Sequence, residues 1–135
     1  YGKQVAANAK ALAEGLLSRG YNLAGGGTDT HLLIIDFRDK EYTGKDVAEA
    51  LARAGIIGNF NMVPGDPRSP FVTSGVRLGT PGVTGMGMKE PQMDLIAGWI
   101  DRVCQNITDV EETAKQVRAE IAEICKQFVP PGYGE

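Results

Sequence analysis

The chain has 135 residues, a formal charge of −3 and 42% hydrophobic residues, the size and composition of one ordinary globular domain. These values exclude a disordered chain and a basic nucleic-acid-binding protein, and no apolar stretch reaches the roughly 18 residues of a membrane span. Glycine is unusually frequent: 18 of the 135 residues are glycine, about 13%, whereas average proteins contain only about 7%.

The N-terminal part predicts a helix followed by two strands. The helix is indicated by apolar residues at helical spacing, namely Val5, Ala9, Leu12 and Leu16. Gly20 is a natural C-cap for it. A short strand is expected over residues 21–23, and a second over residues 31–37 (HLLIIDF). The nearly continuous apolar character of that second run suggests a strand covered on both faces.

A second helix is expected to begin at Thr43, because Asp46 three residues later resembles a capping box. Its apolar stripe consists of Val47, Leu51 and Ala54, and Gly55 ends it.

Two further helices are predicted near the C-terminus. The stripe of the first consists of Met93, Ile96, Ile100, Val103 and Ile107. The stripe of the second consists of Val110, Ala114, Val117, Ile121, Ile124 and Phe128. Thr108 or Asp109 can cap this last helix, and Pro130 and Pro131 are expected to stop it. The element order predicts an α/β (α+β) two-layer sandwich, in which helices pack on one face of a small, mainly antiparallel or mixed sheet.

The two cysteines, Cys104 and Cys125, are interpreted as buried, reduced thiols of a cytoplasmic protein. A Cys/His zinc site is excluded because the chain has one histidine, so no metal is expected. Tyr1 is not a natural start, which suggests that residues 1–135 are one domain cut from a longer protein.

Residues 54–88 differ sharply from the rest of the chain. They include only three charged residues, Asp66, Arg68 and Arg77, among eight glycines and four prolines. A long, nearly uncharged segment of this kind inside a compact domain indicates either a functional segment or a wrong assignment of the elements. A strand here would place Val72, Ser74, Val76 and Leu78 on one face and Thr73, Gly75, Arg77 and Gly79 on the other.

Arg77 is the strongest candidate for a binding residue. It lies on a predicted strand with glycines beside it on its own face, which leaves space next to the guanidinium. Arginine is suited to binding a planar carboxylate through two parallel hydrogen bonds. The alternative is a structural ion pair with an acidic residue elsewhere in the chain.

Two other segments in this region have residues suited to a flat ligand. The sequence Asn59-Phe60-Asn61 combines amides that can pair with a heterocycle and a ring that can cover it, although asparagine also forms turns. Ser69, Pro70 and Phe71 form a rigid polar and apolar element that could equally be an ordinary loop.

Other motifs are given structural interpretations. The glycines of residues 25–27 could cradle a phosphate, but no helix follows them, so a tight turn is favoured. His31 is interpreted as a structural histidine. None of the seven lysines lies in an apolar context that would suit a Schiff base. The residues alone therefore indicate part of a binding site, without a group that could carry out the reaction.

Residues 59–84 (NFNMVPGDPRSPFVTSGVRLGTPGVT) closely resemble the C-terminal domain of the serine hydroxymethyltransferase family. Residues 4–38 and 43–56 agree with this resemblance, which covers about residues 1–128. It implies a small domain that closes the active site of a pyridoxal 5′-phosphate enzyme of fold type I. Residues 1–20 would be the helix that leads in from a large domain of the same chain, which carries the Schiff-base lysine.

The resemblance also implies partners and site residues. The family interconverts serine and glycine and passes a one-carbon unit to tetrahydrofolate. Arg77 matches the arginine that binds the substrate carboxylate, Asn61 matches an asparagine that contacts the pterin ring, and Ser69, Pro70 and Phe71 match a folate-binding stretch. The chain departs from the family at residues 84–87 (TGMG), where one or two arginines are usual.

We therefore expect a cytoplasmic, homodimeric transferase without nucleic-acid or membrane partners. This chain alone should lack activity, because the Schiff-base lysine is absent from it. The alternative is a stand-alone, non-catalytic module for interaction or dimerisation.

Overall fold

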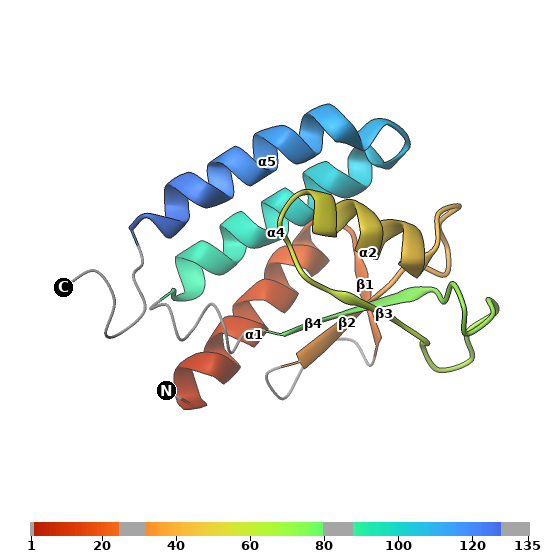
Figure 1. Ribbon diagram of the computed structural model, residues 1–135. Helices are drawn as coiled ribbons and strands as arrows, with labels where there is room; N and C mark the ends of the chain where they lie inside the picture. Colours follow the sequence, from red (N-terminus) through yellow and green to blue (C-terminus); the bar gives the residue numbers. More distant parts are fainter. Residues whose placement is uncertain (1, 25–31, 80–87, 128–135) are drawn as a thin grey trace.

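The computed structural model describes residues 2–24, 32–79 and 88–127. Its elements in chain order are α1 (Gly2–Ser18), β1 (Asn22–Leu23), β2 (Leu32–Asp36), α2 (Gly44–Arg53), β3 (Asn59–Asn61), β4 (Gly75–Gly79), α4 (Glu90–Gln105), the 3-10 helix η2 (Ile107–Asp109) and α5 (Val110–Cys125). The strands form one antiparallel sheet in the order β1-β2-β4-β3. The α-helices lie on one side of this sheet (Figure 1), which confirms the predicted two-layer sandwich.

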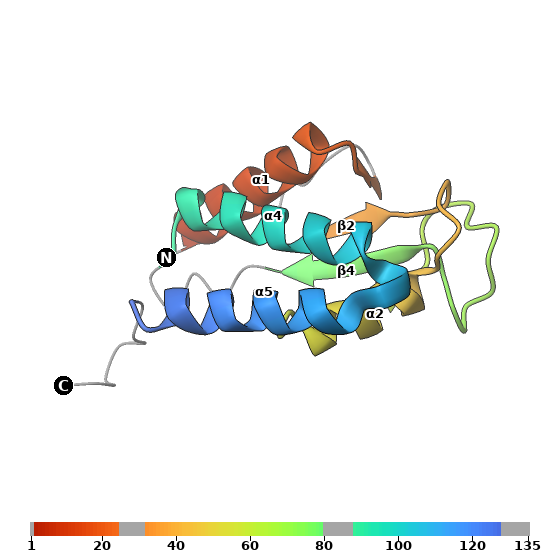
Figure 2. The same cartoon turned by 90° about the horizontal axis from the view of Figure 1, so that it is seen from above.

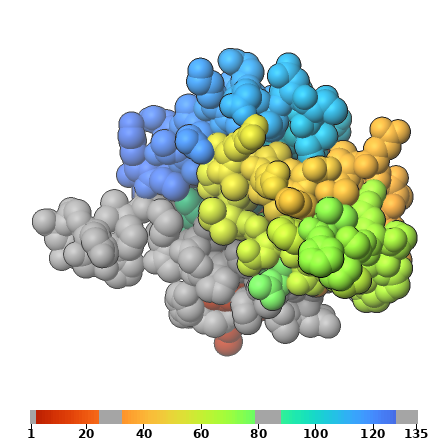
Figure 3. Space-filling model, turned by 45° about the vertical axis from the view of Figure 1, so that its right-hand side comes forward, coloured from red at the N-terminus to blue at the C-terminus, as the bar shows by residue number. Residues whose placement is uncertain are grey.

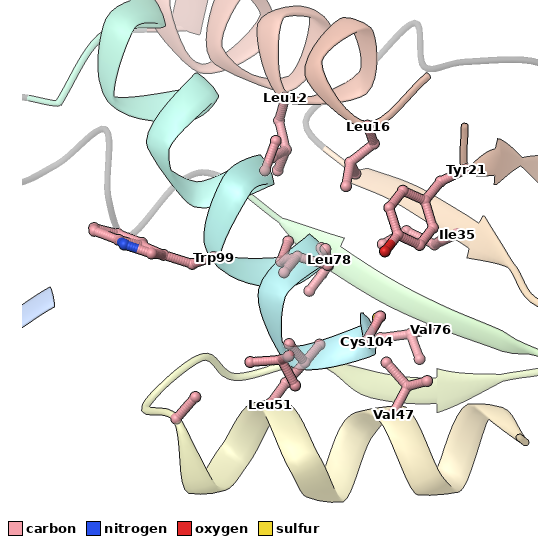
Figure 4. Close-up of a cluster of buried hydrophobic side chains, with 14 of the residues drawn as sticks. Leu12, Leu16, Tyr21, Ile35, Val47, Leu51, Val76, Leu78, Trp99 and Cys104 are labelled. Atoms are coloured by element: carbon pink, nitrogen blue, oxygen red, sulfur yellow. The ribbon is translucent and has the colours of Figure 1, made fainter. Parts of the chain in front are cut away.

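The hydrophobic core fills the space between the helices and the sheet. Helix α4 packs against α1, α2 and α5, so it lies at the centre of the helical layer (Figure 2). Figure 4 shows side chains from α1, α2, β2 and β4 converging around α4, including Leu12, Leu16, Ile35, Val47, Leu51, Val76 and Leu78. All of these side chains are buried, as the predicted apolar stripes require.

The helix ends follow the predicted signals in the first half of the chain. The Asp46 amide donates to Thr43 Oγ1 at 3.1 Å, and the Thr43 amide donates to Asp46 Oδ2 at 2.9 Å, which is the predicted capping box. Gly20 and Gly55, which follow α1 and α2, both have φ of 91°, a backbone conformation that favours glycine after a helix.

The prediction that the strand at residues 31–37 is covered on both faces is wrong for the described residues. Leu33 and Ile35 are buried beneath the helices, whereas Ile34 points to the other face and is half-buried. The helices all pack on one side, so an apolar side chain on the second face remains partly open. His31 lies outside the described residues.

The strand that carries Arg77 is shorter than predicted. It begins at Gly75 rather than Val72, because Thr73 has a positive φ of 55° and its amide donates to the Ser69 carbonyl at 2.9 Å. The predicted alternation holds within the strand, where Val76 and Leu78 are buried and Arg77 is exposed.

The C-terminal helix also ends earlier than predicted. Helix α5 stops at Cys125, and the Gln127 amide donates to the Ile124 carbonyl in a turn, so the later prolines do not set its end. Asp109 occupies the N-cap position, but its side chain makes no capping hydrogen bond. Phe128, Pro130 and Pro131 lie outside the described residues.

Both cysteines are free thiols, as predicted, but only Cys104 is buried. Cys125 is half-buried because it lies in the last turn of α5, at the edge of the core. Among the described residues, no helix combines the length and apolar character needed to cross a membrane.

Candidate functional site

Arg77 lies at the middle of β4 on the face of the sheet that the described helices leave open. Its neighbours across the sheet are Ile34 on β2 and Asn59 on β3. Strand alternation sends the flanking Val76 and Leu78 into the core at 0% and 4% exposure, and it directs Arg77 away from the helices. The fold therefore presents the Arg77 guanidinium on a helix-free surface.

Gly75 is on the same face of β4 as Arg77, two residues before it. It allows close packing of the strands and leaves space next to the guanidinium. A Cβ at Gly75 would lie 2.5 Å from the Asn61 carbonyl oxygen and 2.8 Å from Val63 Cγ1. No side chain fits there without moving backbone, so Gly75 allows the β3 end of the sheet to approach β4 closely. No side chain therefore projects from the sheet at residue 75, two positions before Arg77.

The described residues do not supply the structural ion pair that was the alternative for Arg77. Five ion pairs form within these parts of the chain, and Arg77 takes part in none of them. Its guanidinium also donates no hydrogen bond to a described residue. A cation in this state on an open face is available for an anionic ligand.

The Asn59-Phe60-Asn61 segment forms the edge strand β3, rather than a turn. Asn61 is opposite Gly75, and its Nδ2 donates to the Met62 carbonyl at 3.0 Å. Both amides share the face of Arg77, but alternation sends Phe60 to the opposite face, where it is 41% exposed. The idea that Phe60 covers a ligand held by these two amides is therefore wrong.

Ser69, Pro70 and Phe71 lie in the loop of residues 62–74, which projects beyond one end of the sheet (Figures 1 and 2). All three are exposed, and Phe71 is 81% exposed. The structure brings Asn61 and Arg77 onto one face of the sheet, but among the described residues no hydrogen bond joins Ser69–Phe71 to either of them.

The loop of residues 62–74 is organised around Asp66, whose role the sequence analysis missed. Its Oδ1 accepts hydrogen bonds from the Arg68 amide at 2.8 Å and from Ser74 Oγ at 2.7 Å. Its Oδ2 accepts from the Ser74 amide at 2.8 Å and from the Val63 amide at 3.3 Å. The signal in the sequence was a single carboxylate within a long uncharged segment.

These hydrogen bonds fix the charge of Asp66. Partial burial acts to raise the pKa of its carboxyl, but the hydrogen bonds donated by Arg68, Ser74 and Val63 outweigh this effect and hold the pKa at about 2. Asp66 is therefore ionised throughout the physiological pH range.

Arg68 connects the same loop to the end of β2. Its Nη1 donates to the Phe37 carbonyl at 3.2 Å and to Ser74 Oγ at 3.0 Å, and its Nη2 donates to the Lys40 carbonyl. In Figure 3 the green side chains of this loop lie against the orange segment that follows β2. The Arg68 guanidinium thus makes its hydrogen bonds within the protein, whereas the Arg77 guanidinium makes none with the described residues.

Several apolar side chains are exposed in β3, in the segment just before it and in the loop after it. They are Ile57 at 80%, Phe60 at 41%, Met62 at 44% and Phe71 at 81% exposure. Exposed apolar side chains within one short part of the chain are typical of contact with another surface or ligand.

All seven lysines are exposed, and none lies on a strand, so the chain offers no buried amine for covalent catalysis. Among the described residues, no cluster of three metal-ligating side chains occurs. The glycine loop of residues 25–27, His31 and the departure at residues 84–87 lie outside the described residues.

Comparisons with known proteins agree on one family. The family model described as serine hydroxymethyltransferase matches residues 1–100. The chain is 57% identical over 135 residues to serine hydroxymethyltransferase 2 of Mesorhizobium japonicum. It is 49% identical over 132 residues to the serine hydroxymethyltransferase of Sorangium cellulosum, and 49% identical over 134 residues to that of Halorhodospira halophila.

These alignments cover 100%, 98% and 99% of this chain, respectively. They cover only 31%, 31% and 32% of the relatives. The chain therefore spans about a third of the length of the curated relatives it matches.

Proposed function

The chain belongs to the serine hydroxymethyltransferase family, and from that premise we propose that it is the C-terminal, active-site-closing domain of such an enzyme. The reaction is the interconversion of serine and glycine, with transfer of a one-carbon unit to tetrahydrofolate. The observation that carries the proposal is the exposed Arg77, unpaired among the described residues, on the helix-free face of the sheet.

In this proposal Arg77 binds the carboxylate of serine or glycine. The planar guanidinium donates two parallel hydrogen bonds to the two carboxylate oxygens, which fixes both the position and the rotation of the amino acid. Orientation matters because the bond to be broken at the α-carbon must be held in one direction relative to the reacting centre.

Asn61 is proposed to contact the pterin ring of folate. A primary amide both donates and accepts, so it can pair with a pterin edge that presents a donor and an acceptor side by side. Asn61 is on the same face as Arg77, which supports neighbouring sites for folate and the amino acid. Ser69, Pro70 and Phe71 would contribute a second wall from the loop, where Phe71 is free to cover a ring.

Pyridoxal 5′-phosphate is expected from the family, but its covalent site does not fit this chain. The lysines here are all exposed and none is on a strand, so we assign the Schiff-base lysine to the part of the enzyme that this chain does not span. When bound, the cofactor supplies an electron sink. The contribution of this chain is to bind and orient the two substrates.

Assembly and location are part of the same proposal. We propose a homodimeric, cytoplasmic enzyme, with the helix-free face of this domain turned toward a large domain of the same chain.

The experiment is to assay a full-length protein carrying this chain for glycine formation from serine, with and without tetrahydrofolate. We expect folate-dependent turnover from the full-length protein and none from the 135-residue chain alone. A full-length protein that binds pyridoxal phosphate but neither cleaves nor forms serine would refute the proposed reaction.

A further inference from the structure

We propose that Asp66 is a positioning residue that sets the spacing between the strand carrying Asn61 and the strand carrying Arg77. The inference rests on the proposed function, because it assigns these two residues to folate and to the amino acid. Asp66 itself would touch neither substrate.

The Asp66 carboxylate links both ends of the connection between β3 and β4. Val63, whose amide it binds at 3.3 Å, is two residues after Asn61. Ser74, whose amide it binds at 2.8 Å, is three residues before Arg77. One side chain thus closes the loop of residues 62–74 near the points where the chain leaves β3 and enters β4.

A carboxylate is the only common side chain that suits these bonds. Each of its oxygens accepts at least one backbone amide, from Arg68 on Oδ1 and from Val63 and Ser74 on Oδ2. An asparagine at this position would direct its NH2 group toward a backbone N–H in either orientation. A donor would then face a donor, and at least one partly buried hydrogen bond would be lost.

A second group of contacts ties this loop to β2. Ser74 Oγ donates to Asp66 and accepts from Arg68, which also donates to the Phe37 carbonyl. The Phe37 amide in turn donates to the Ser74 carbonyl at 2.7 Å. The Asp66 network therefore reaches the ends of β2, β3 and β4, which are the three strands that form the Arg77 surface.

The same network supports an unfavourable backbone conformation. Thr73 is a β-branched residue with φ of 55°, and its carbonyl accepts the Gly44 amide at 3.0 Å at the start of α2. Such conformations persist where surrounding contacts over-determine them, and they occur often at ligand sites. The adjacent Ser74, bound twice by Asp66, supplies those contacts on one side.

The test compares Asp66→Asn with wild type in a full-length protein carrying this chain. The control is Asp39→Asn, which removes the same charge from an exposed residue whose carboxylate, among the described residues, accepts a hydrogen bond from Asn22 alone, at 3.3 Å. For wild type and both variants, we measure KM for serine, KM for tetrahydrofolate and the absorbance of the bound cofactor. We also measure the hydrogen exchange of the backbone amides of residues 61–77. We expect Asp66→Asn to raise both KM values about tenfold or more, with cofactor absorbance unchanged and faster exchange in residues 61–77. Asp39→Asn should change none of these.

Ser74→Ala is the second variant, in case Asp66→Asn does not fold. It removes one of the four hydrogen bonds and the link to Arg68, so both KM values should rise by a smaller factor, about threefold. A folded Asp66→Asn or Ser74→Ala variant with both KM values within the error of wild type would overturn the inference. A rise in only one KM value would also overturn it, because the network would then not set the spacing of both strands.

Hydrogen exchange separates this inference from the proposed function. If the wild-type protein has no transferase activity, the proposed function fails. Faster exchange of residues 61–77 in Asp66→Asn but not in Asp39→Asn would still support Asp66 as the residue that fixes the two strands. Unchanged exchange in this segment would overturn the positioning role, whatever the activity.

Discussion

Arg77 and Asn59 are directly opposite one another in the antiparallel pairing of β4 and β3. The next pair on the same face is Asn61 with Gly75, so Asn61 is a diagonal neighbour of Arg77. Diagonal neighbours of this kind have Cα atoms about 7–8 Å apart. A guanidinium and two amides therefore share a small area of the sheet, as adjacent sites for a carboxylate and a polar ring would require.

Arg77→Lys should strongly reduce the use of serine by a full-length protein carrying this chain. An ammonium group cannot reproduce the two parallel hydrogen bonds of the guanidinium. We expect kcat/KM for serine to fall by on the order of 10²-fold, about 2.7 kcal/mol, while the absorbance of the bound cofactor stays unchanged. Steady-state kinetics with serine, together with absorbance spectra, measure both effects.

Arg53→Lys is the matched control for this substitution. Arg53 is on α2, and its ion pair with Glu111 is between side chains that are 59% and 74% exposed, so its contribution should be small. Near-normal serine kinetics in Arg77→Lys would remove Arg77 from the carboxylate site.

Asn61→Ala should affect the folate reaction selectively. The amide is assigned to the pterin ring, and the amino-acid carboxylate is assigned to Arg77, so we expect a raised KM for tetrahydrofolate. Cleavage of 3-hydroxy amino acids without folate should change much less. Asn22→Ala is the control, because Asn22 is an exposed asparagine on β1 at the opposite edge of the sheet. If both reactions fall equally in Asn61→Ala, the amide supports the strand instead of the pterin.

The sheet and the placement of Arg77 could be predicted because they depend on local periodicity. Alternation of apolar residues around Arg77 was enough to assign Val76 and Leu78 to the core and Arg77 to the other face. The capping box of Thr43 and Asp46 was likewise predictable, because its signal lies within four residues.

The loop of residues 62–74 could not be predicted in the same way. Its structure depends on hydrogen bonds between residues far apart in the sequence, such as that of Arg68 with the Phe37 carbonyl, 31 positions away. A positive φ at Thr73 is also contrary to the preference of a β-branched residue. Sequence patterns therefore extended β4 to Val72, three residues beyond its true start.

Two helical glycines should respond in opposite directions to alanine. A Cβ at Gly15 would lie 2.9 Å from Ala97 Cβ, where α1 and α4 approach one another. Gly15→Ala should therefore destabilise the chain by about 1–2 kcal/mol, because overpacking exceeds the gain in helix propensity.

Gly98→Ala is the counterpart on α4, where the nearest atom to a new Cβ is Arg19 Nη2 at 3.5 Å. It should stabilise the chain by about 0.5–1 kcal/mol through helix propensity. Urea unfolding of both variants measures the two free energies. Equal destabilisation in both would contradict the close approach of α1 and α4 at Gly15.

Asp66 should make stability depend on pH in the acidic range. Its pKa of about 2 in the folded chain is below the value near 3.9 expected when unfolded, so its stabilising effect is complete above about pH 5. That effect is lost as the pH falls through the range from about 4 to 2. Urea midpoints of wild type and Asp66→Asn should therefore differ at pH 6 and converge as the pH approaches 2. A difference that is independent of pH would mean that the charge of Asp66 is not involved.

The central claim is that Arg77 binds the substrate carboxylate from the helix-free face of the sheet. The most direct measurement is a crystal structure of a full-length protein carrying this chain, with pyridoxal phosphate and glycine bound. We predict two guanidinium N–H groups of Arg77 donating to the two glycine carboxylate oxygens, with N···O distances of about 2.7–2.9 Å. A glycine carboxylate bound by other residues, with Arg77 paired to an acidic side chain of the enzyme, would contradict the account.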